Sequence, residues 1–204
     1  FPYTTLFRSG MSDPRWSEAL AHLPDYLGNH VRVSVAALAL GLLISLPLAI
    51  IARNRPLLRG ALLGLASIVQ TVPGLALLAL FYPLLLALAA LTAAWLGFSF
   101  SAFGFLPAVL ALALYSMLPV LRNTITGLSG VDPAVLEAAE GVGMTPRQSL
   151  TMVELPLALP TILAGVRVSA IIALSTATIG STVAARTLGE VIDGADLFLG
   201  LSGP

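Results

Sequence analysis

The longest stretch of the chain without a charged residue runs from Gly60 to Leu121 and is 62 residues long. Soluble globular domains carry about 25% charged residues, whereas this chain is 10% charged and 57% hydrophobic. A helix crosses the hydrocarbon core of a bilayer with about 20 mostly apolar residues, so the run is too long for one span and long enough for two or three. The sequence therefore predicts a membrane protein built from several transmembrane α-helices.

A second uncharged run, Val33–Ala52, predicts the first span, because its 20 residues match the thickness of the hydrocarbon core. It is followed by a loop that holds Arg53, Arg55 and Arg59 and no acid. Arginine-rich loops stay in the cytoplasm, which predicts the cytoplasmic side for this one. We expect a transmembrane domain over residues 31–191, with spans at about 31–53, 60–88, 104–122 and 158–183.

The number of spans between residues 60 and 121 decides on which side the rest of the chain lies. Two spans, with Pro73 as a candidate break in the first of them, return the chain to the cytoplasm. Three spans would leave it outside. We expect two.

Residues 131–157 lie between two long apolar segments and contain several charged residues and helix-capping residues. Asp132–Pro133 is a helix start signal, since aspartate caps the first backbone amides and the missing N–H of proline is not needed there. A glycine at 143 favours the end of that helix, and Thr145–Pro146 repeats the start signal for a second helix that runs until Pro156. The pattern predicts a helix, a glycine turn and a second helix between membrane spans.

The same segment carries a spaced motif: Glu137-Ala138-Ala139, three residues, Gly143, nine residues, Val153, one residue, and Leu155-Pro156. This spacing resembles the EAA signature of ABC importer membrane subunits, with Val153 in place of the family's isoleucine. The resemblance implies an all-α, polytopic membrane helical bundle of the type I ABC importer permease class, whose cytoplasmic loop couples it to an ATP-binding subunit. The residues that it assigns to coupling are Glu137, Ala138, Ala139, Gly143, Met144, Val153, Leu155 and Pro156.

The resemblance also implies an ABC ATP-binding subunit, a second permease copy or homologue and an extracytoplasmic substrate-binding protein as partners, in a bacterial or archaeal cytoplasmic membrane. The chain has ten arginines and no lysine, so it lacks the lysine of a standard P-loop. We therefore expect no catalytic residue and no cofactor here, with ATP bound by a partner chain. The absence of cysteine excludes thiolate metal sites, and the zero net charge gives no indication of nucleic-acid binding.

Polar side chains inside otherwise apolar spans are candidates for a translocation path, because a polar group in lipid needs a hydrogen-bond partner. These candidates are Gln70, Thr71, Ser116, Ser175, Thr176 and Thr178. The alternative is that each hydroxyl bonds back to a carbonyl of its own helix. Arg167 is expected a turn or two inside the cytoplasmic end of the last span, where it either packs on the coupling loop or acts near a gate.

The segments around the motif look most like the osmoprotectant branch of these importers, which takes up glycine betaine, choline or carnitine. Methionine and other amino-acid importers are the alternative. An ion-coupled secondary transporter is less favoured, because that class commonly carries acids within its spans, and no Asp or Glu lies between Asp25 and Asp132 or in residues 161–183. A membrane-embedded enzyme ranks last, since no metal cluster or catalytic set lies within a span.

The two ends of the chain carry predictions of their own. Residues 1–10 resemble a translated sequencing adapter and are expected to be non-native, with Met11 as the start. Residues 11–30 predict an N-terminal amphipathic segment that is broken at Pro24. Family members usually have a further span after a Leu-Gly-Glu segment such as 188–190, so we expect residues 192–204 to be a truncated end without that last span.

Overall fold

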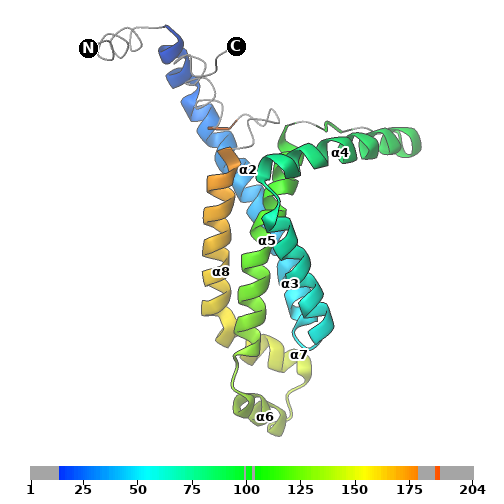
Figure 1. The fold of residues 1–204 in the computed structure, drawn as a ribbon. Helices are drawn as coiled ribbons and strands as arrows, with labels where there is room; N and C mark the ends of the chain where they lie inside the picture. The colour runs from blue at the N-terminus through cyan, green and yellow to red at the C-terminus, as the bar shows by residue number, and fades with distance from the viewer. Residues whose placement is uncertain (1–13, 99, 103, 179–186, 189–204) are drawn as a thin grey trace.

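The computed structural model describes residues 14–98, 100–102, 104–178 and 187–188, and its described elements are all helices (Figure 1). Four helical stretches are long and apolar enough to cross a membrane: Ala21–Ala52, Ala79–Leu96, Phe105–Ser129 and Pro146–Thr176. The prediction of an all-α membrane bundle with about four spans is confirmed. The predicted adapter-like leader, the predicted truncated end and the last part of the predicted fourth span lie outside the described residues.

Helix α2 (Pro14–Ala52) joins the predicted amphipathic segment and the first span in a single helix of 39 residues. The predicted break at Pro24 is wrong, because the helix continues through both Pro24 and Pro47. A proline inside a helix costs about 3 kcal/mol through one lost hydrogen bond and a steric clash. The regular helical turns on both sides of each proline outweigh that local cost.

The predicted second span, 60–88, is two helices, α3 (Pro56–Thr71) and α4 (Gly74–Leu96), which are separated at Val72–Pro73. Pro73 cannot donate a backbone hydrogen bond to the preceding turn and stands at the start of α4 with a ψ of 140°. In Figure 1, α3 runs beside α5, whereas α4 extends away from the bundle, crosswise to both. The candidate break at Pro73 is confirmed.

Helix α5 (Phe105–Ser129) is the centre of the bundle and packs against α2, α3, α4 and α8. The helix continues for two further turns beyond residue 122, where the span is predicted to end, and the end of the span itself stays a prediction. Leu121, Ile125 and Leu128 are all buried at helical spacing, while Arg122 is exposed on another face. The charge of Arg122 therefore does not end the helix, since its side chain stays clear of the core.

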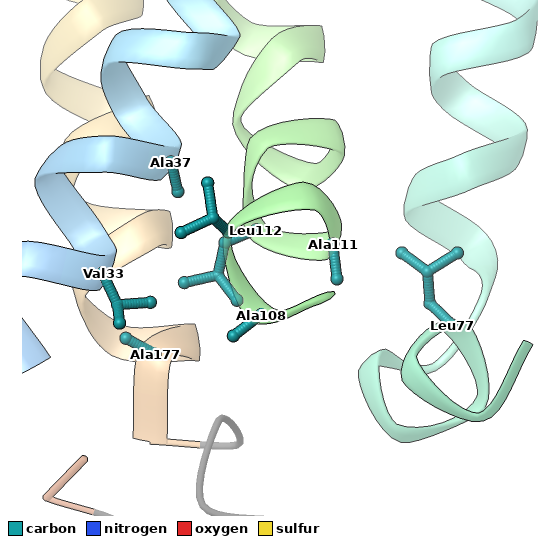
Figure 2. Packing of buried hydrophobic residues seen from close by; sticks show 8 residues of the cluster. Val33, Ala37, Leu77, Ala108, Ala111, Leu112 and Ala177 are labelled. Carbon is teal, nitrogen blue, oxygen red and sulfur yellow. The ribbon is translucent and has the colours of Figure 1, made fainter. Parts of the chain in front are cut away.

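Figure 2 shows one cluster of the core, in which Val33 and Ala37 of α2 meet Ala108 and Leu112 of α5, with Ala177 just after α8 (Leu155–Thr176) beside them. All of these side chains are at most 2% exposed. Most of them are small, as is usual where membrane helices approach closely.

Glycines bring α5 even closer to its two main neighbours. A β-carbon at Gly165 of α8 would lie 2.6 Å from the β-carbon of Asn123 and 2.8 Å from the carbonyl oxygen of Pro119. A β-carbon at Gly41 of α2 would clash with the hydroxyl of Ser116. Backbone contact of this kind holds α2, α5 and α8 in one arrangement.

The prediction that the second loop helix runs only until Pro156 is also wrong. Helix α7 (Pro146–Ser149), the π-helical turn η1 (Leu150–Glu154) and α8 follow one another without interruption. In η1 the amide of Leu155 donates to the carbonyl of Leu150, five residues back. This wider turn changes the hydrogen-bond register immediately before Pro156, so the chain passes the proline as a helix and α8 begins earlier than residue 158.

Candidate coupling loop and translocation path

The loop after α5 is built from local signals, as predicted. Asp132 accepts a hydrogen bond of 2.9 Å from the amide of Ala134 and caps α6 (Pro133–Gly141). Gly143 has a φ of 81°, a left-handed conformation that favours glycine. Thr145 caps α7 in a reciprocal pair with Gln148. The two helix starts and the glycine turn are confirmed, and Figure 1 shows α6 at the end of the bundle.

The predicted coupling residues of α6 do not all face the same way. Glu137 and Ala138 are exposed, whereas Ala139 is only 5% exposed. Met144 is half-buried, and its amide donates to the carbonyl of Ala139 at 3.1 Å. Ala139 therefore packs within its own chain, and its role in coupling stays a prediction.

The sequence reasoning missed an exposed apolar residue at the end of α6. Val142 is 75% exposed, and Val135 on the same short helix is 39% exposed. The signal was present in the sequence, since a valine between Gly141 and Gly143 stands at a helix end where nothing of its own chain covers it.

The last part of the motif lies against the membrane bundle. Leu155 packs with Leu150 on a cluster formed by Leu128, Ala158 and Ile162. The remaining motif positions differ in exposure, since Val153 is half-buried and Pro156 is exposed.

One ion pair joins the loop to the first membrane helix, and the sequence reasoning missed it. A guanidinium nitrogen of Arg53 lies 3.4 Å from a carboxylate oxygen of Glu154, and the two side chains are only 15% and 10% exposed. The hydroxyl of Ser149 also donates to Glu154 at 3.5 Å. The basic loop after α2 and the motif loop therefore lie at the same end of the bundle, as the prediction of two spans between them requires.

Of two further predicted path residues, Gln70 joins two helices, whereas Ser116 bonds back within its own helix. The Gln70 side chain donates to the Tyr115 carbonyl at 2.9 Å, and the Tyr115 hydroxyl donates to the Val72 carbonyl. This pair fastens the junction of α3 and α4 to α5. The Ser116 side chain is fully buried and donates to the Ala113 carbonyl at 2.9 Å. A path-lining role for Gln70 and Ser116 stays a prediction beside these packing roles.

The other predicted path residues belong to the last turns of α3 and α8 or directly follow α8, and these helix ends lie away from α6 (Figure 1). The hydroxyls of Thr71, Ser175 and Thr178 donate to carbonyls three or four residues back, at 2.7 Å, 2.8 Å and 2.9 Å. Thr176 is half-buried at the last position of α8. The back-bonding alternative therefore describes three of these four hydroxyls and the hydroxyl of Ser116 as well.

Arg167 lies near the middle of α8. Because α8 begins at Leu155, Arg167 is about three turns from the start of this helix. Its side chain is exposed and forms no ion pair with any residue that the structure describes. Both roles predicted for Arg167, packing on the coupling loop and acting near a gate, stay predictions.

The chain is similar to known proteins of one family. Residues 37–201 match the family described as "Binding-protein-dependent transport system inner membrane component". The chain belongs to this family. It is therefore the membrane-spanning permease subunit of an ABC importer in the inner membrane and is not itself an enzyme.

Several curated bacterial permease proteins are similar to this permease subunit. The choline transport system permease protein OpuBB of Bacillus subtilis is 39% identical over 85% of this chain and 70% of its own length. The glycine betaine/carnitine/choline transport system permease protein OpuCB of the same organism is 39% identical over 86% and 71%. The osmoprotectant import permease protein OsmW of Salmonella typhimurium is 33% identical over 89% and 81%.

Solved structures share the fold at lower identity. An inward-facing structure of the MetNI methionine ABC transporter has a TM-score of 0.70 at 21% identity and covers 88% of this chain and 81% of its own. An amino acid ABC transporter solved with histidines has a TM-score of 0.67 at 22% identity, over 89% and 81%. These likenesses concern the fold of the permease subunit alone.

Proposed function

We propose that this permease subunit belongs to an importer of quaternary-ammonium osmoprotectants of the glycine betaine, choline or carnitine type. The observation that carries the proposal is the agreement among its relatives, which are named for choline, for glycine betaine, carnitine and choline, and for osmoprotectants. Each likeness extends over at least 85% of this chain. It therefore includes the membrane helices that would face the substrate as well as the motif loop.

In this proposal α6 is the contact for a separate ATP-binding subunit. Glu137 and Ala138 are exposed on it, and Val142 stands out at its end. An exposed ion pair made by Glu137 would contribute only about 0–1 kcal/mol. The apolar side chains of Val135 and Val142 must therefore supply most of the contact through which force passes.

Helices that are continuous or paired would carry a movement of α6 into the membrane. Helix α5 leads into α6, and α7, η1 and α8 lead out of it as one helical run. The Arg53–Glu154 pair ties this run to the end of α2. A push on α6 would then displace α2, α5 and α8 together, which are the three helices of the packed core.

The translocation path in this proposal lies between the permease subunit and a second copy or a homologue. The outer surface of α8 is exposed at Leu163, Arg167 and Ile171, and Arg167 acts near the gate. Thr71, Ser175, Thr176 and Thr178 line the mouth opposite to the coupling loop. An extracytoplasmic binding protein delivers the substrate to that mouth.

The test is uptake by the complete transporter, reconstituted in vesicles with its ATP-binding subunit and its binding protein. We expect ATP-dependent accumulation of radiolabelled choline, glycine betaine or carnitine, and none of methionine. ATP-dependent uptake of methionine instead would reassign the permease subunit to the amino-acid importers. Uptake driven by an ion gradient without the ATP-binding subunit would contradict the proposal entirely.

A further inference from the structure

A cleft opens between the end of α2 and the start of α7, outside the residues assigned to coupling or to the path. Its volume is about 460 Å³, and it is lined by Ile50, Ile51, Arg53, Asn54, Arg55, Pro146, Arg147 and Leu150. Small-molecule sites commonly measure about 300–1,000 Å³. The cleft is therefore large enough for a polar headgroup.

The charge of this cleft is positive. Arg53 is neutralised by Glu154 at 3.4 Å. Arg55 and Arg147 are exposed and form no ion pair with any described residue of the chain. Two guanidinium groups with unused donors favour an anion with several oxygens, because arginine binds phosphate oxygens with two parallel hydrogen bonds.

The other wall of the cleft is apolar. Ile50 and Ile51 belong to the last turn of α2, and Ile51 is 51% exposed. Leu150 faces them from η1. These residues stand where two membrane-crossing stretches end, so one side of the cleft borders lipid and the other borders water. A ligand with an anionic head and an apolar tail satisfies both walls, whereas a free phosphate would leave the apolar wall uncovered.

We propose that this cleft binds the headgroup of an anionic phospholipid from the cytoplasmic leaflet, with the phosphate on Arg55 and Arg147 and an acyl chain along Ile51. The proposal rests on the orientation in the proposed function, with the coupling loop in the cytoplasm. Basic pockets between membrane helices on that side are suited to lipid headgroups. A lipid seated here touches both α2 and the α7–η1 run, which the Arg53–Glu154 pair also joins, so the lipid composition would change how firmly the loop is held.

The experiment measures binding of phosphatidylglycerol to the complete transporter by native mass spectrometry, after release from vesicles of phosphatidylcholine with phosphatidylglycerol. An arginine near an anionic lipid surface contributes about a fivefold change in affinity. We therefore expect about fivefold weaker binding for R55Q and for R147Q, and a larger loss for the two together. Arg59→Gln is the matched control, since Arg59 lies one turn after Arg55 in α3 and does not line the cleft.

Three results would overturn the proposal. The first is equal phosphatidylglycerol binding by the wild type and the R55Q/R147Q variant. The second is complete displacement of the lipid by inorganic phosphate, which would make the cleft a site for free phosphate. The third is loss of the ATP-binding subunit from the variant in phosphatidylcholine alone, which would assign both arginines to the subunit contact. None of these readouts depends on which substrate is transported, so failure of the uptake test leaves the lipid result interpretable.

Discussion

The packed core of α2, α5 and α8 and the loop that contains α6 are specified in different ways. In the core, helices meet through small residues and through glycines whose β-carbons would strike a neighbour's backbone or side chain. In the loop, the helices begin and end through caps within a few residues, at Asp132, Gly143 and Thr145. The volume of the side chains therefore determines how closely the core helices pack, whereas hydrogen bonds within a few residues determine where the loop helices begin and end.

The sharpest way to break the core is to add volume at Gly165. We expect Gly165→Leu to destabilise the protein by about 3 kcal/mol or more, because its side chain must displace Asn123 and the Pro119 carbonyl. Thermal unfolding of the purified protein measures this effect. Gly64→Leu is the control, since a β-carbon at Gly64 meets nothing within 4 Å. Equal melting temperatures for the two variants would show that α5 and α8 are not held by close backbone contact.

The Arg53–Glu154 ion pair connects the two regions. We expect its loss to have the second-largest effect on stability. Glu154→Gln leaves a largely buried guanidinium without its counter-charge, which we expect to cost about 2 kcal/mol. R53Q/E154Q should be less damaging than E154Q alone, because no unpaired charge is left. A double-mutant cycle on thermal unfolding measures the interaction. If the changes in unfolding free energy of R53Q and E154Q simply add up in the double variant, the two side chains do not stabilise the protein through each other.

Removal of a cap should affect the loop and leave the core intact. Asp132→Ala removes the hydrogen bond to the Ala134 amide, and loss of such a cap costs about 1 kcal/mol. We expect faster amide hydrogen exchange in α6 and unchanged exchange in α5. Equal acceleration in both helices would mean that the loop and the core unfold together and are not independent.

The smallest effect on stability is expected on the exposed face of α6. Glu137→Arg should change the free energy of unfolding by less than about 0.5 kcal/mol, as is usual for exposed sites, yet weaken binding to the ATP-binding subunit. Co-purification of that subunit measures the change. Glu140→Arg serves as the control, because Glu140 is also exposed on α6. The coupling role proposed for Glu137 fails if both variants retain the subunit equally.

Prediction from the sequence succeeded where a signal lies within a few residues. The caps of α6 and α7, the glycine turn and the break at Pro73 belong to this group. It failed where a proline was taken as a helix boundary, at Pro24 and Pro156. At Pro24 the regular helical turns on both sides outweigh the local cost of the proline, and before Pro156 a wider helical turn changes the hydrogen-bond register.

For the candidate site, the motif identified the loop but not the orientation of its side chains. Ala139 belongs to the motif and is buried, while Val142 stands outside it and is exposed. The Arg53–Glu154 pair joins residues that are about a hundred positions apart, and no local spacing indicates it. Contacts of this kind depend on which helices become neighbours.

The sequence by itself determined that this protein lies in a membrane, that its loop begins and ends at particular caps, and that it belongs with importer permeases. The length of an apolar run and the hydrogen bonds of a helix cap involve residues close together in the sequence, so the sequence alone indicates them. Only the tertiary structure decided that the basic loop and the motif loop meet at one end, and which motif residues remain accessible. Both depend on the packing of α5 between α2 and α8, where glycines separated by more than a hundred residues set how closely the helices approach.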